Sequence, residues 1–98
     1  MSTLTTFTFE EVTEHPQVKK MVSKFRQQDQ DKVKDYFYKV YIKHFNAWES
    51  DERKQQHSLK NIKKVEWNRE ENCFNVYYKK TKHFRETWYH YTLSGKWY

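Results

Sequence analysis

The strongest chemical signal in this chain is a cluster of cations near its C-terminal end. The segment covering residues 79–85 contains Lys79, Lys80, Lys82 and Arg85. Adjacent cations at the tip of a hairpin can contact the phosphates of a nucleic-acid backbone, and each contact adds to the salt dependence of binding. Lys63 and Lys64 lie one predicted strand away and extend the cluster. The pattern predicts a phosphate-contacting surface, and an ordinary solvated loop is the alternative interpretation.

Two aromatic residues flank this basic segment. Tyr77 precedes it and Trp88 follows it, and both are candidates for outward-facing rings on a sheet. Rings beside Lys and Arg can stack on nucleic-acid bases, with a contribution of ~1–3 kcal/mol for each base. Packing beneath helices on a second sheet face, or at a dimer interface, is the alternative for both rings. No RNP-type aromatic motif is present, so the sequence does not indicate an RRM.

The residue types that catalyse reactions or bind metals show no such grouping. Cys73 is the single cysteine, which excludes an intramolecular disulfide and a cage of thiolates. A nucleophilic cysteine needs a histidine and an orienting group, which the spacing does not supply. One glycine cannot form a Gly-rich phosphate cradle. The sequence therefore predicts a protein that is not an enzyme and has neither a cofactor nor a metal.

The histidines and the paired glutamates also have plain structural interpretations. His44 falls in an apolar stripe, which predicts a core residue with a hydrogen-bond partner. Glu70 and Glu71 are predicted to form a solvated pair in a turn. The five histidines share no spacing typical of a metal site: His15, His44, His57, His83 and His90.

Composition and charge describe a small, basic, aromatic-rich chain. Its 98 residues carry a formal net charge of +6, and 19% of them are Phe, Tyr or Trp. Large rings can replace a scarce aliphatic core, so one folded domain is expected. Excess positive charge favours a polyanionic partner. The chain shows neither a secretory signal nor ~18 consecutive apolar residues, which predicts a cytoplasmic protein that does not enter a membrane.

The helical part is expected over residues 16–56. Pro16 suits the first position of a helix whose apolar stripe is formed by Val18, Met21, Val22 and Phe25. Asp29 is a plausible N-cap for a second helix, and one bent helix is the alternative. The second helix is apolar on two sides, which predicts a place between the first helix and a sheet. Residues 49–60 lack periodicity and are interpreted as the helix end plus a connection.

The N-terminal segment, residues 1–15, has two interpretations. Residues 3–9 are β-branched and aromatic, which favours a short strand. Thr8 followed by Glu11 matches a capping box instead, which would start a helical turn at Phe9.

After residue 60 the apolar period changes to two, which predicts a β-meander over residues 60–98. A hairpin loop at residues 68–72 pairs Val65 with Val76 and Trp67 with Phe74. The third strand, residues 84–93, is ambiguous, although its odd-numbered residues suit the core better near its end. Ser94 and Gly95 indicate a turn, after which residues 96–98 fold back as a short last strand.

These elements predict an α+β fold in which two N-terminal helices pack on a C-terminal antiparallel β-meander of three strands, or of four if residues 96–98 pair. Helices followed by a meander ending in Thr92-Leu93-Ser94-Gly95-Lys96-Trp97-Tyr98 resemble cystatin-like and NTF2-like folds. The resemblance implies a helix lying across the sheet and implies no site residue.

The leading functional hypothesis is a non-enzymatic accessory protein that binds DNA or RNA. The alternative is a protein-binding inhibitor or assembly factor, for example of a mobile element, in which the same Tyr, Trp and Arg side chains anchor a protein interface. A homodimer that covers surplus rings is a further expectation.

Overall fold

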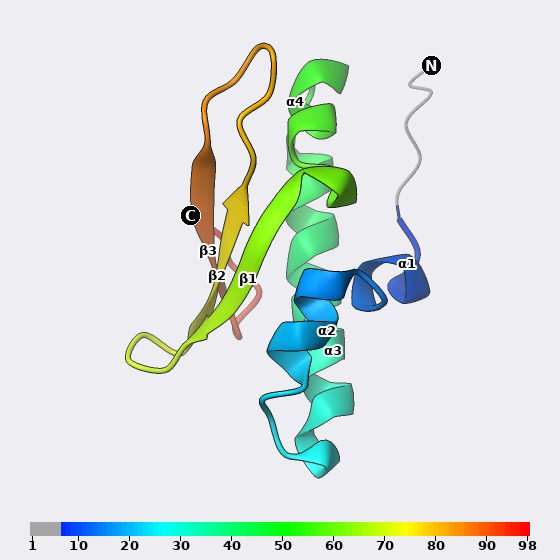
Figure 1. Ribbon diagram of the computed structural model, residues 1–98, viewed down its shortest axis with the longest axis vertical. Helices are drawn as coiled ribbons and strands as arrows, with labels where there is room; N and C mark the ends of the chain where they lie inside the picture. The colour runs from blue at the N-terminus through cyan, green and yellow to red at the C-terminus, as the bar shows by residue number, and fades with distance from the viewer. Residues whose placement is uncertain (1–6) are drawn as a thin grey trace.

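The computed structural model describes residues 7–98 and has an α+β fold (Figure 1). The three strands form one antiparallel sheet in the order β1-β2-β3. The helices all lie on one side of it, so the predicted fold class is confirmed. The described elements are α1 (Phe9–Thr13), α2 (Pro16–Val22), α3 (Gln27–Ala47), α4 (Asp51–Gln56), the 3₁₀ turn η1 (Leu59–Asn61), β1 (Ile62–Asn68), β2 (Cys73–Tyr78) and β3 (Thr87–Thr92).

The first helix begins with a reciprocal capping box. The Glu11 backbone N–H donates to Thr8 Oγ1 at 3.2 Å, and the Thr8 backbone N–H donates to Glu11 Oε1 at 3.0 Å. Two N–H groups that the helix leaves unpaired are thereby satisfied. The prediction of a helical turn at Phe9 is confirmed. Most of the alternative strand at residues 3–9 lies outside the described residues, but Phe7 and Thr8 are not in a strand.

The two predicted helices are α2 and α3, and they are separate rather than one bent helix. Phe25 lies beyond Val22, the last residue of α2. Its ring packs edge-on against Trp67, with ring centroids 5.5 Å apart. The prediction of Asp29 as N-cap is wrong, because α3 begins at Gln27 and its N-cap is Arg26. Asp29 lies in the first turn instead, where its carboxylate interacts favourably with the positive end of the helix dipole.

Residues 49–60 are more ordered than predicted, because they contain α4. The Ser50 hydroxyl caps this helix by accepting the Arg53 backbone N–H at 3.2 Å. Acidic residues occupy its first turn and basic residues its last turn, as the helix dipole favours. The chain then buries Gln56, His57 and Ser58 against the rest of the protein. A capped helix was missed because it is too short and polar to show an apolar stripe.

The hairpin register follows the alternation of the sequence. Val65 pairs with Val76 and Trp67 pairs with Phe74, as predicted. The third strand is shorter than the predicted range, residues 84–93. β3 covers Thr87–Thr92, and residues 84–86 belong to the loop of residues 79–86. The odd-numbered residues of β3 face the helices, as Tyr91, which is fully buried, shows. Residues 96–98 do fold back through a bridge between Trp97 and Tyr91, although they add no regular fourth strand.

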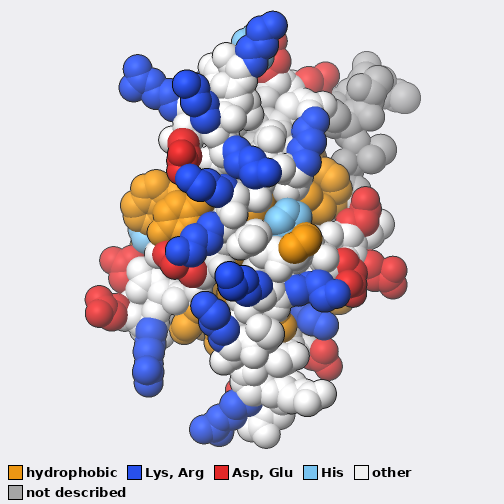
Figure 2. Space-filling model, in the orientation of Figure 1, with side chains coloured by type: hydrophobic (Ala, Val, Ile, Leu, Met, Phe, Trp, Pro, Cys, Tyr) orange, Lys and Arg blue, Asp and Glu red, His pale blue; other side chains and the backbone are white. Residues whose placement is uncertain are grey.

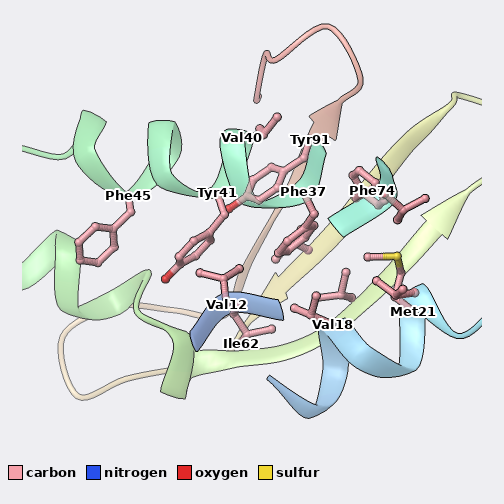
Figure 3. Packing of buried hydrophobic residues seen from close by; sticks show 14 of the residues in the cluster. Val12, Val18, Met21, Phe37, Val40, Tyr41, Phe45, Ile62, Phe74 and Tyr91 are labelled. Carbon is pink, nitrogen blue, oxygen red and sulfur yellow. The ribbon is translucent and has the colours of Figure 1, made fainter. Parts of the chain in front are cut away.

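Within residues 7–98, the buried core between the helices and the sheet combines six rings with nine aliphatic side chains. Rings and aliphatic groups from the helices and the sheet meet in it (Figure 3). Phe37 of α3 packs against Phe74 and Tyr91, with ring centroids 5.5 Å and 5.6 Å away. Val12 of α1 and Val18 of α2 are buried in the same cluster. α3 contacts β3 as well as α1 and α2, so its apolar sides are covered. The predicted layering is only partly right, because α2 also packs directly on β1.

A chain of buried polar groups crosses this core. Tyr78 and Tyr91 share a hydrogen bond of 2.6 Å between their hydroxyls, and the Tyr91 hydroxyl lies 2.6 Å from His44 Nδ1. His57 Nε2 lies 3.2 Å from the Tyr89 hydroxyl, and His57 Nδ1 lies 2.7 Å from the Arg53 carbonyl. The prediction that His44 is a hydrogen-bonded core residue is confirmed. The network joins α3, α4 and the sheet.

Candidate nucleic-acid interface

The sheet face that points away from the helices carries the two predicted rings. Lys64, Tyr77 and Trp88 are consecutive partners across the three strands. The rings of Tyr77 and Trp88 stack with centroids 5.7 Å apart and planes inclined by 21°. Trp88 keeps 52% of its surface exposed. Packing beneath a described helix, one alternative for these rings, is therefore wrong.

A glutamate holds Tyr77 in this position. The Tyr77 hydroxyl donates to Glu66 Oε1 at 2.8 Å, and Lys64 Nζ lies 3.3 Å from Glu66 Oε2. The hydrogen bond from Tyr77, followed by the contact with Lys64, lowers the pKa of the Glu66 carboxyl. The same hydrogen bond raises the pKa of the Tyr77 phenol. Tyr77 is thus a fixed platform for Trp88, whose exposed surface is left for a ligand.

The basic segment lies at the same end of the sheet as these rings. Tyr78 and Thr87 form the last pair of the β2–β3 ladder, and the Tyr77–Trp88 pair is the next one inward. The loop that joins the two strands, residues 79–86, projects beyond this end, beside α4 (Figure 1). The basic loop and the aromatic pair therefore share one end of the sheet.

Backbone and side-chain contacts hold the loop against its neighbours. The Lys79 backbone N–H donates to the Asn61 carbonyl at 2.8 Å. On α4, the Arg53 guanidinium lies 4.3 Å from the centroid of the Phe84 ring, and Gln56 Nε2 donates to the Arg85 carbonyl at 3.3 Å. The loop is therefore positioned by α4, which lies in the segment predicted to be a helix end plus a connection.

A cleft of about 380 Å³ opens between this loop and α4. Its lining is rich in cations and amides, with one carboxylate from Glu52. Such donors can bind phosphate oxygens. The lining residues with donor groups are Gln55, Gln56, Lys60, Asn61, Lys80, Thr81, Lys82 and His83. Lys60 of η1 and the two glutamines of α4 were missed as site residues. The Ser50 cap followed by acidic residues was the signal that could have revealed α4.

The predicted cations differ in their electrostatic surroundings. Lys63 Nζ lies 2.8 Å from Glu86 Oε1, and Lys64 is paired with Glu66. None of the remaining four forms an ion pair within residues 7–98: Lys79, Lys80, Lys82 and Arg85. Figure 2 shows that Lys and Arg side chains spread over the face that carries β1 and α2, while Asp and Glu lie mainly toward its edges. Among the six predicted cations, the four in the loop are therefore the ones without a carboxylate partner in the described chain.

Comparisons with protein-family models, with curated proteins and with solved structures found no match to this chain. Among the described helices, none combines the length and the apolar character that crossing a membrane requires.

Proposed function

We propose that this protein binds DNA or RNA through the basic loop, residues 79–85, and the adjoining open sheet face, without catalysing a reaction. One observation carries the proposal: four cations without an ion-pair partner within residues 7–98 lie in the loop that continues from the end of the sheet where Trp88, whose ring is exposed, stacks on Tyr77. Cations that neutralise phosphates supply affinity, and an exposed ring supplies a surface on which a base can stack.

In this proposal the loop binds the phosphates and the sheet binds a base. Lys79, Lys80, Lys82 and Arg85 contact the nucleic-acid backbone, and Lys63 and Lys64 extend these contacts along β1. A base stacks on Trp88, which Tyr77 supports from the other side. Only an unpaired base has an accessible face, so a single strand is the preferred ligand. The proposed location is the cytoplasm, where the single thiol would stay reduced.

A titration of labelled oligonucleotides tests the proposal. Single-stranded and double-stranded DNA and RNA of equal length are titrated with the protein between roughly 50 and 200 mM salt, the range in which phosphate contacts show. We expect binding that weakens steeply with salt and that favours single strands. If none of the four nucleic acids binds at the lowest salt concentration, the proposal is wrong.

Replacing Trp88 tests the stacking contact by itself. Trp88→Ala is expected to weaken binding of a single strand roughly tenfold, because one stacked base contributes ~1–3 kcal/mol. The slope of affinity against salt should stay the same, since no cation is removed. Tyr36→Ala is the matched control, because Tyr36 is an exposed ring on α3. Equal binding by the Trp88 variant and the wild type would exclude Trp88 from the site.

The alternative is a protein-binding inhibitor or assembly factor that uses the same surface, including self-association as a homodimer. Exposed rings favour it, because Trp88 and Tyr98 both lie largely open to solvent. Trp, Tyr and Arg are the residue types that dominate protein interfaces. This alternative predicts no nucleic-acid binding and a partner contact that depends on Trp88 but only weakly on salt.

A further inference from the structure

Three side chains of different chemistry converge at the hairpin end of the open sheet face. Cys73 begins β2, His90 lies on β3 and Glu71 lies in the turn that precedes Cys73. Cys73 Sγ lies 3.3 Å from His90 Nδ1, and Glu71 Oε2 lies 3.7 Å from the same nitrogen. The three atoms all lie within 4.8 Å of one another. A thiol, an imidazole and a carboxylate are the groups that bind zinc in proteins.

These spacings approach those of a tetrahedral metal centre. Bond lengths of about 2.0–2.3 Å to zinc put neighbouring ligand atoms roughly 3.3–3.7 Å apart. The sulfur–nitrogen and nitrogen–oxygen distances already fall in this range. Asn75 Oδ1 lies 3.0 Å from His90 Nδ1 and 3.7 Å from Cys73 Sγ, close enough to fill a fourth position. An ion can therefore be accommodated by small side-chain movements.

We propose that Glu71, Cys73 and His90 bind a divalent transition-metal ion of the zinc class. Charge supports a divalent ion, because one thiolate and one carboxylate neutralise two positive charges. The mixed sulfur, nitrogen and oxygen donors select zinc over magnesium or calcium, which prefer oxygen ligands. The proposal does not rest on nucleic-acid binding.

The surroundings shield the thiol from solvent and orient the imidazole. Cys73 is 1% exposed. His90 is oriented by the rings of Trp88 and Tyr98, each with its centroid 4.8 Å away. Glu71 is exposed, so an ion can enter from the turn.

Titration with Co²⁺ tests this site directly. Co²⁺ takes the place of zinc and absorbs strongly in the near ultraviolet when a thiolate binds it, and Cys73 is the single thiol of the chain. We expect this absorption to appear and saturate at one equivalent, and Zn²⁺ to abolish it. Cys73→Ser should remove it, while His90→Gln and Glu71→Gln should each weaken Co²⁺ binding by at least about tenfold, since each removes one ligand.

The controls distinguish a site with several ligands from Co²⁺ binding by the Cys73 thiol alone. His83→Gln removes a histidine from the exposed loop and should leave Co²⁺ binding unchanged. Circular dichroism establishes that each variant is folded, and Glu71→Gln is the safest variant because Glu71 lies in an exposed turn. The proposal is overturned if a several-fold excess of Co²⁺ gives no thiolate absorption. It is also overturned if folded Glu71→Gln and His90→Gln variants bind Co²⁺ as tightly as the wild type.

Discussion

Reversing the charge of the four loop cations is expected to weaken nucleic-acid binding by roughly a thousandfold or more. The variant carries Lys79→Glu, Lys80→Glu, Lys82→Glu and Arg85→Glu. A charged hydrogen bond to phosphate contributes at least about 1 kcal/mol, and four such contacts correspond to roughly three powers of ten in affinity. The measurement is the same oligonucleotide titration, carried out at a fixed low salt concentration.

The salt dependence distinguishes lost contacts from a general change of charge. Removing four phosphate contacts from a single-strand complex should lower the slope of log affinity against log salt by about 2.8. A matched control reverses four exposed cations at the hairpin end of the molecule: Lys24, Arg26, Lys32 and Arg69. Both variants reduce the formal net charge from +6 to −2. Equal losses in the two would show that total charge, and not the loop, governs binding.

Lowering the pH from 7 to 5 is expected to reduce the free energy of unfolding by about 2 kcal/mol through His44 and by about 2 kcal/mol through His57. Both side chains are 0% exposed. Burial, followed by the neighbouring His57 ring, lowers the pKa of His44 to about 3. Burial also lowers the pKa of His57 to about 4, with a further lowering by the Arg53 guanidinium and an opposing hydrogen bond to the Arg53 carbonyl.

The free energy of unfolding falls as the pH is lowered because the unfolded state takes up protons at a higher pH than the folded state does. In the unfolded chain a histidine titrates near its ordinary pKa of 6.5, so below that pH the unfolded state binds more protons than the folded state. Stability is therefore complete above pH 6.5 and falls by about 1.4 kcal/mol per pH unit for each histidine. The loss continues to about pH 4 for His57 and to about pH 3 for His44.

Urea unfolding followed by tryptophan fluorescence at pH 7 and pH 5 measures this effect. Carboxyl groups with a lowered pKa, such as Glu66, titrate below the usual 4.5 and contribute little in this window. His44→Gln should reduce the difference between the two pH values by about 2 kcal/mol. Equal stability of the wild type at pH 7 and pH 5 would contradict the assignment of both histidines as buried and neutral.

Much of this fold could be predicted because its signals are local. Alternating residues of the hairpin specify the pairing of Trp67 with Phe74, because a slip of one position would turn the apolar residues outward. Thr8 and Glu11 lie within one helical turn, so their capping box is readable directly. α4 was missed although its Ser50 cap is local, because a short polar helix shows no apolar period.

The candidate site was predictable in its charges but not in its arrangement. The cations of the basic loop are adjacent in sequence, so a cluster was evident without a structure. Whether Trp88 points inward or outward depended on the register of β3, where either set of alternate residues contains large rings. Tertiary packing decided this, because burying Tyr91 against Phe37 turns Trp88 to the open face.

The sequence by itself determined a core containing many rings, a hairpin register and a basic loop, since each follows from residue type and short-range spacing. Only the tertiary structure decided how α4 holds that loop, that His44 and His57 are buried together, and that Cys73 meets His90. These contacts join residues far apart in the chain, and their formation depends on how the third strand and the helices pack. No local pattern encodes that packing, because it is the core as a whole that places the elements side by side.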